Sequence, residues 1–127
     1  MNPIVVDASA LGAILFEEPS GAQVWPRLQG VTVCAPTLLK FELATIAVTK
    51  SRRHPESTVQ FFSALALVID DRTDIVWHDV PATDVAVMAR ATGLSAYDAS
   101  YLSLAGMLDA DLVTLDRKLS AALEERP

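Results

Sequence analysis

The chain has 127 residues, enough for one domain (residues 1–127) with its own core and too few for two. Hydrophobic residues make up 51% of it, yet no uninterrupted apolar run reaches the roughly 18 residues of a membrane helix. The net charge of −6 does not suggest a nucleic-acid binder, and one cysteine with two histidines argues against a structural zinc site.

The N-terminus and the cysteine content indicate a compartment. Asp7 interrupts the first apolar run and no basic segment precedes it, which argues against a signal peptide. Cys34 has no second cysteine to pair with and suits a reducing environment. We therefore expect a cytoplasmic protein with no membrane association.

Predicted strands and helices alternate along the chain. Short apolar or β-branched runs predict buried strands at residues 4–7, 31–35, 75–77 and 111–115. Helical patterns cover residues 7–17, 22–29, 37–51, 56–69, 82–92, 96–110 and 117–125. Strands separated by helices predict the α/β class: a three-layer α/β/α fold with a parallel sheet of about four strands.

The helix predicted over residues 37–51 carries an acid on its apolar face. Glu42 shares that face with Leu38 and Ile46, because residues four apart are neighbours on a helix. A carboxylate there is costly unless it is paired, hydrogen-bonded or bound to a metal ion. The basic run at residues 50–54 favours cations at a helix C-terminus over a nucleic-acid contact patch.

Two helices carry more apolar surface than one buried face requires. The residues expected to share a face of the helix over 56–69 are Val59, Phe62, Leu65 and Ala66. Phe61 lies opposite them, and a partner groove is predicted between it and the first helix at Leu11, Ile14, Leu15 and Phe16. The groove would receive an amphipathic segment. Cys34, Trp25 and Trp77 are expected in the core.

The segment over residues 94–119 places two acids at element boundaries. Ser95 and Asp98 have the spacing of a capping box, which predicts a helix from Ala96. Its small apolar face for close packing would contain Ala99, Leu102, Ala105 and Gly106. Asp116 follows the strand predicted next, so it lies at a carboxyl end as Asp7 does.

Asp7, Glu42, Asp98 and Asp116 can meet at the edge where parallel strands end. Each also has a plain structural alternative: an N-cap for Asp7 and Asp116, a capping box for Asp98, and a buried ion pair for Glu42. Together, with no obvious cation beside them, they would repel one another unless protons or a hard divalent cation intervened. Oxygen-only ligation suits Mg²⁺ or Mn²⁺, which can activate water for phosphodiester cleavage.

The segments around these acids resemble a known family. They are VVDASAL, PTLLKFELA, LSAYDASYLSLA and LVTLDRKL, and in this order they are similar to the motifs of PIN-domain ribonucleases, above all the VapC-type toxins of bacterial type II toxin–antitoxin modules. The resemblance covers nearly the whole chain. It implies a Mg²⁺- or Mn²⁺-dependent endoribonuclease whose substrate is RNA.

The resemblance also assigns roles. The four acids would be the catalytic residues and metal ligands, and Ser9 would orient an acid or a metal-bound water. Thr114 is a weaker auxiliary candidate, for which a plain strand role is favoured. A homodimer and inhibition by a cognate antitoxin protein are implied as well. Such domains usually end in a fifth strand, but residues 117–127 predict a helix here, so four strands are expected and dimerisation can differ.

Two other functions stay open. One is a non-catalytic PIN-like module that only binds a partner, against which the complete acidic set argues. The other is a receiver-type phosphoryl-transfer domain that uses Asp7. The sequence does not support it, because it has neither a Gly-rich phosphate loop nor a second acid beside Asp7. Turn roles are favoured for His78 and Asp79, and a phosphate contact is a minority interpretation for Arg117 and Lys118. The sequence does not indicate which RNA would be cut.

Overall fold

Four short parallel strands form the sheet of this protein. The computed structural model describes residues 2–69 and 73–125. The strands are β1 (Pro3–Val6), β2 (Thr32–Pro36), β3 (Val76–His78) and β4 (Asp111–Val113), in the order β3-β2-β1-β4. Val5 of β1 pairs with Cys34 on one side and with Leu112 on the other. The central strand is therefore enclosed by neighbours, as its β-branched run predicts.

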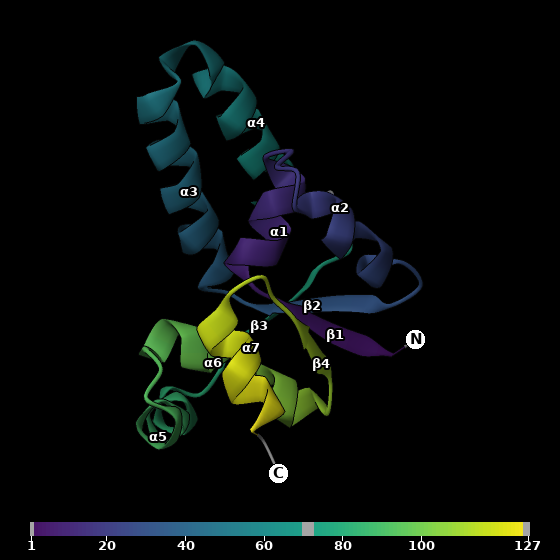
Figure 1. The fold of residues 1–127 in the computed structure, drawn as a ribbon, viewed down its shortest axis with the longest axis vertical. Coiled ribbons are helices and arrows are strands. Elements are labelled where there is room, and N and C mark those ends of the chain that lie inside the picture. The colour runs from purple at the N-terminus through teal and green to yellow at the C-terminus, as the bar shows by residue number, and fades with distance from the viewer. Residues whose placement is uncertain (1, 70–72, 126–127) are drawn as a thin grey trace.

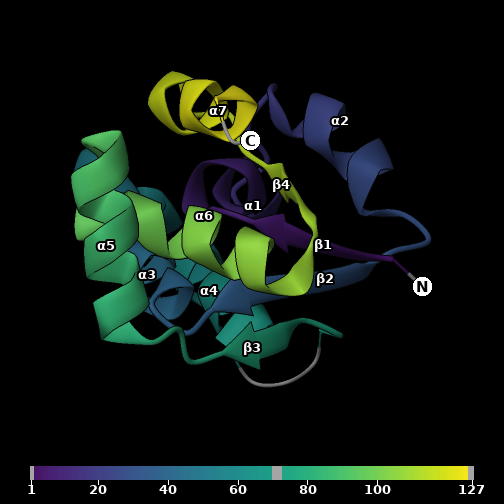
Figure 2. The ribbon, with the colours of Figure 1, turned by 90° about the horizontal axis from the view of Figure 1, so that it is seen from below.

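Helices cover both faces of the sheet, which confirms the predicted three-layer α/β/α fold (Figure 1). One face carries α1 (Ala8–Leu15), α2 (Gly21–Val24), α3 (Leu39–Arg53) and α4 (Thr58–Ile69). The other carries α5 (Ala82–Thr92), α6 (Ala96–Leu108) and α7 (Arg117–Glu124), as Figure 2 shows from below. Short 3₁₀ helices follow α2 (Trp25–Leu28) and precede α4 (Pro55–Ser57). Helices α3 and α4 form a hairpin that rises away from the sheet (Figure 1).

The strand order creates a switch point between β1 and β4. From β1 the chain crosses one face to reach β2 and then β3, and it returns across the other face to β4. The chain therefore continues from β1 into α1 on one face of the sheet and from β4 into α7 on the other. Because the strands are parallel, their carboxyl ends all lie at the same edge of the sheet. Ligands of open α/β sheets bind at such a point.

Helix α4 buries a face different from the predicted one. Phe61 packs inward, where its ring meets that of Phe16 edge to face with centroids 6.1 Å apart. Val59 and Phe62 point outward and are 78% and 46% exposed, so the predicted face is wrong except for Leu65, which packs against the core. Nine of the twelve positions of this helix are apolar, and the pattern therefore does not single out one face.

The same packing changes the predicted partner groove. Leu11 and Phe16 are buried in the core and cannot both serve as open anchor positions. A hollow of about 350 Å³ remains beside Phe16, and its lining includes Leu15, Phe61 and Ala64. A partner at this place stays a prediction.

Smaller differences from the sequence analysis concern single residues. Trp25 is 57% exposed and not in the core, because the second predicted helix changes to a 3₁₀ helix at this residue. Gly106 is exposed and so lies outside the close-packed face of α6. Cys34 is buried, and Trp77 packs partly against the core with the Lys40 Nζ atom 4.7 Å from its ring centroid. Most of the predicted polar loop, residues 70–72, lies outside the described residues.

None of the helices between residues 2 and 69 or between 73 and 125 combines the length and the apolarity of a bilayer-crossing segment.

Candidate active site

Asp7 is fixed at the carboxyl end of β1 by three donors to its side chain and by one hydrogen bond that its own N–H donates. It is 4% exposed and caps α1, where the Ala10 N–H donates to its Oδ1 atom at 3.0 Å. Ser9 Oγ donates to the same oxygen at 2.7 Å, and Thr114 Oγ1 donates to Oδ2. The Asp7 N–H itself donates to the Val113 carbonyl at 3.3 Å. Capping and site formation thus use the same side chain.

Two hydroxyls join the turn after β1 to the turn after β4. Ser9 Oγ accepts from the Leu115 N–H at 2.9 Å and lies 3.3 Å from Thr114 Oγ1. Thr114 Oγ1 in turn accepts from the Asp116 N–H at 2.9 Å. The plain strand role favoured for Thr114 is therefore wrong: the residue follows the last residue of β4, and its hydroxyl links Asp7 to the backbone of Asp116.

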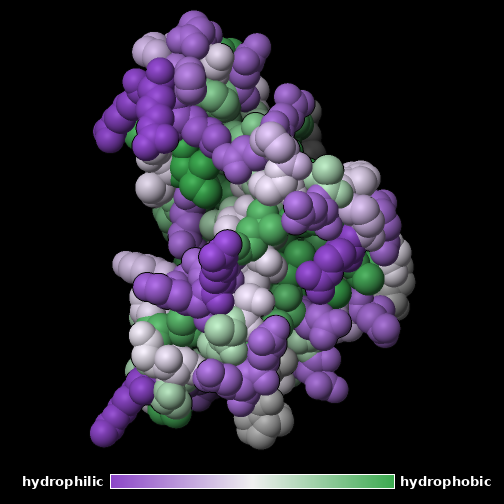
Figure 3. Space-filling model, in the orientation of Figure 1, coloured by the Kyte–Doolittle hydropathy of each residue, from purple (hydrophilic) through white to green (hydrophobic). Residues whose placement is uncertain are grey.

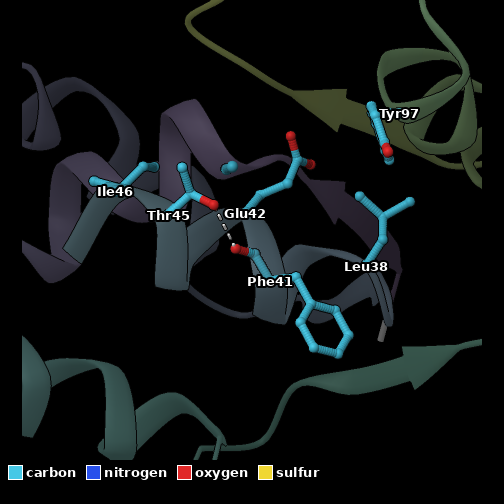
Figure 4. A pocket seen from close by; sticks show the side chains of 7 residues that line it. Leu38, Phe41, Glu42, Thr45, Ile46 and Tyr97 are labelled. Carbon is cyan, nitrogen blue, oxygen red and sulfur yellow. Dashed lines mark hydrogen bonds between the residues drawn. The ribbon is translucent and has the colours of Figure 1, made fainter. Parts of the chain in front are cut away.

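Glu42 lies in the first turn of α3 and is held from across the site. The Tyr101 hydroxyl of α6, whose side chain is buried, donates to Glu42 Oε1. Figure 4 shows the Glu42 carboxylate extended into the space between α3 and Tyr97. No local pattern in the sequence points to Tyr101, because its partner Glu42 lies 59 positions away.

The two remaining acids both lie at the starts of helices. Ser95 caps α6 by accepting from the Asp98 N–H at 3.1 Å, so the predicted cap is confirmed and the Asp98 side chain is partly buried beside it. Asp116 caps α7, with the Leu119 N–H donating to its Oδ1 atom at 3.0 Å. Their backbone positions are therefore set by the same interactions that start the helices.

Burial and, to a smaller extent, neighbouring carboxylates raise the pKa values of Asp7 and Glu42. Burial raises the pKa of Asp7 and outweighs the lowering by its hydrogen bonds, the largest of them from Thr114, while the charge of Asp116 raises it further. Burial also raises the pKa of Glu42; the Tyr101 hydrogen bond opposes this, and the charges of Asp98 and Asp7 add to it. Acids from separate elements are thus electrostatically coupled at this edge.

Asp98 completes the coupled set. Burial is the largest cause that raises the pKa of Asp98, and the charge of Asp116 raises it further. The Ser95 hydrogen bond and the charge of Lys118 lower this pKa in part. The ion pairs found among residues 2–69 and 73–125 are Lys50–Glu18 and His54–Glu56, neither of which includes one of the four acids. The acids are therefore left with little compensating positive charge.

The donor set has the chemistry of a hard-cation site. Carboxylates and the hydroxyls of Ser9 and Thr114 line it, and oxygen ligands of this kind suit Mg²⁺ or Mn²⁺. Within the described ranges, no three His, Cys, Asp or Glu side chains form a ready-made cluster for a metal ion.

Several other candidate residues have structural contacts. Lys50 Nζ lies 2.6 Å from Glu18 Oε1 and 5.9 Å from the centroid of the Phe16 ring, so part of the basic run at the end of α3 serves packing. Thr37 Oγ1 donates to Asp79 Oδ1 at 3.2 Å, which agrees with a turn role for Asp79.

Comparison with known proteins decides the family. The model of the PIN domain family matches residues 4–123. The chain belongs to the PIN-domain family. This PIN domain is 32% identical over 119 residues to Ribonuclease VapC12 of Mycobacterium tuberculosis, a match that covers 92% of the chain and 89% of the relative. The predicted resemblance to VapC-type PIN domains is thereby confirmed.

Two crystal structures share the fold of this PIN domain. PAE2754 from Pyrobaculum aerophilum superimposes with a TM-score of 0.78 at 25% identity, over 99% of this chain and 88% of that one. Mycobacterium tuberculosis VapC20, described as a sarcin-ricin loop cleaving toxin, superimposes with a TM-score of 0.66 at 18% identity, over 98% and 99% of the two chains. The second likeness shows the fold alone.

Proposed function

We infer that this PIN domain is a toxin-type endoribonuclease with Asp7, Glu42, Asp98 and Asp116 as its catalytic and metal-binding acids. One observation carries the proposal: the four acids lie at element starts along the carboxyl edge of the sheet, Asp7 and Asp116 as the caps of α1 and α7, and Glu42 and Asp98 in the first turns of α3 and α6. A family match over residues 4–123 and a relative named as a ribonuclease support the same activity.

The residues of the chain hold and position these acids. Ser9 and Thr114 keep both Asp7 oxygens in place, and Tyr101 does the same for Glu42. Ser9 is thus a positioning residue. When bound, Mg²⁺ or Mn²⁺ supplies an activated water and stabilises negative charge on the phosphodiester. The acids would hold that ion at the edge of the sheet.

The partners follow from the same proposal. The protein would act in the cytoplasm on RNA, as a homodimer, under inhibition by a cognate antitoxin protein. Because the chain has a net charge of −6, a basic partner segment is electrostatically favoured. The hollow beside Phe16 and Phe61 is the proposed place for its apolar anchors.

The decisive experiment compares two acids at helix starts. Purified wild type, Asp116→Asn and Asp84→Asn are incubated with mixed RNA in Mn²⁺ or in EDTA. Asp84 is exposed in the first turn of α5 and serves as the matched control. Asn caps a helix about as well as Asp, so Asp116→Asn keeps the fold while weakening a hard-cation site.

We expect Mn²⁺-dependent cleavage by wild type and Asp84→Asn, and strongly reduced cleavage by Asp116→Asn. An Asp116→Asn protein as active as wild type would leave Asp116 as a cap only. If the wild type cleaved no RNA in Mn²⁺, the alternative of a non-catalytic partner-binding module would replace the proposal.

A further inference from the structure

An apolar hollow of about 660 Å³ lies directly beside Glu42. Its walls come from Leu38, Phe41, Thr45 and Ile46 of the α3 segment and from Tyr97 of α6 (Figure 4). Figure 3 shows the surface hollowed between the α3–α4 hairpin and the helices below the sheet, with hydrophobic surface on α3 above the hollow. The volume lies within the roughly 300–1,000 Å³ typical of small-molecule sites.

Two aromatic rings at this hollow are exposed to solvent. Phe41 is 76% exposed and Tyr97 is 66% exposed. Each directly precedes an acid of the proposed active site, Phe41 before Glu42 and Tyr97 before Asp98. The two helices that deliver these acids therefore also deliver one ring each to the adjoining space. Neither ring contributes to the core, so neither is explained by folding.

The hollow offers ring faces and few free hydrogen-bonding groups. The Thr45 hydroxyl donates to the Phe41 carbonyl of its own helix at 3.1 Å. Glu42 Oε1 already accepts from Tyr101. A phosphate inside the hollow, away from a metal ion, would be repelled by the Glu42 carboxylate, whereas an uncharged planar group could stack on the rings. Such a surface recognises the face of a nucleobase and does not read its edge.

We propose that this hollow receives one unpaired base of the RNA substrate, with Phe41 and Tyr97 as its stacking surfaces. Its position beside the cleaved phosphodiester rests on the proposed function, but binding of the base does not require cleavage. Only an unstacked nucleotide can insert its base, so single-stranded segments and loops are the expected substrate class. The identity of this base should matter little.

The test measures binding of single-stranded RNA oligonucleotides that carry 2-aminopurine at successive positions. Ca²⁺ replaces Mn²⁺, and a gel verifies that no cleavage occurs. The proteins are wild type, Phe41→Ala, Tyr97→Ala, the ring-preserving Tyr97→Phe, and Trp25→Ala. Trp25 is the matched control, because it is an exposed aromatic residue that does not line this hollow.

We expect Phe41→Ala and Tyr97→Ala each to weaken binding by about fivefold or more, while Tyr97→Phe and Trp25→Ala bind like wild type. One 2-aminopurine position should be quenched by wild type and released by the alanine variants. An abasic nucleotide at that position should weaken binding by the wild type to a similar extent. With this abasic RNA the alanine variants should bind like wild type, because the missing base and the missing ring delete the same interaction. The affinity for a blunt duplex of the same sequence should be the same in wild type and in the alanine variants.

Wild-type affinity and unchanged quenching in both alanine variants would overturn the proposal. So would unchanged RNA affinity accompanied by a loss of dimer mass in light scattering, which would assign the rings to an interface between copies. Failure of the wild type to cleave in Mn²⁺ would refute the endoribonuclease activity and leave the quenching measurement in Ca²⁺ valid. The two proposals therefore fail separately.

Discussion

At the scale of single residues, Asp7 illustrates how a buried carboxylate is tolerated. Burial raises its pKa, and hydrogen bonds from Thr114, Ala10 and Ser9 lower it again in part. The Thr114 bond is the largest of these compensating contributions. An unsatisfied buried acceptor is destabilising, so the loss of this hydroxyl should be felt more than the loss of its methyl group.

Thr114→Val should therefore lower the free energy of unfolding by about 1–3 kcal/mol, the usual cost of leaving a buried polar group unsatisfied. Thr114→Ser keeps the hydroxyl and should cost about half of that or less. Urea unfolding in EDTA measures both variants against wild type. Equal losses in the two variants would mean that the Asp7–Thr114 bond contributes little.

Cys34 gives a pH-dependent prediction. Its side chain is 3% exposed, and burial raises the pKa of its thiol above the ordinary value. The reactive thiolate is therefore scarce at pH 8, and the native protein should react with Ellman's reagent far more slowly than the guanidinium-unfolded protein. Because the folded state keeps the thiol protonated, its contribution to the free energy of unfolding is fully present below the ordinary thiol pKa. This contribution decreases as the pH rises through the raised pKa. Equal native and unfolded reaction rates would contradict this burial.

At the scale of elements, the sequence predicts what local signals specify. Helix α5 has the predicted bounds because Gly93 ends it with a positive φ of 75°, a conformation that favours glycine. The acids are locatable because each lies beside a strand end, a cap or an apolar helix face. The hydrogen-bond partner of Glu42 cannot be located in this way, because Tyr101 contacts Glu42 only after α3 and α6 have packed together.

The corrected face of α4 leads to a matched pair of substitutions. Phe61→Ala removes a ring that packs on Phe16 and should lower the free energy of unfolding by about 2–4 kcal/mol. Phe62→Ala removes a neighbouring ring that is 46% exposed and should cost about 1 kcal/mol or less. Thermal or urea unfolding distinguishes them, and the opposite order would restore the face predicted from periodicity.

At the scale of the whole molecule, the acidic balance connects folding with ligand binding. The chain carries a net charge of −6, and coupled carboxylates gather at one edge of its sheet. A cation that binds this edge only in the folded state must stabilise the fold by mass action. Folding stability thus reports on the proposed site without any substrate.

Mg²⁺ or Mn²⁺ should raise the free energy of unfolding by about 2.7 kcal/mol at a hundredfold excess over Kd, and EDTA should reverse the gain. Asp116→Asn should be at least as stable as wild type in EDTA, because one repelling charge is gone, and should gain less from the metal. Differential scanning calorimetry follows both proteins. Melting curves that ignore millimolar metal would count against a folded metal site.

The bond between Asp7 and Thr114 spans 107 positions, and this separation sets an order in time. A ribosome releases the N-terminal residues first, so Asp7 emerges long before the strand and the hydroxyl that complete its surroundings. Every nascent chain that ends before β4 holds its first acid without the partner that fixes it. The proposed nuclease site would therefore stay incomplete during most of its own synthesis, until residues 111–119 have left the ribosome.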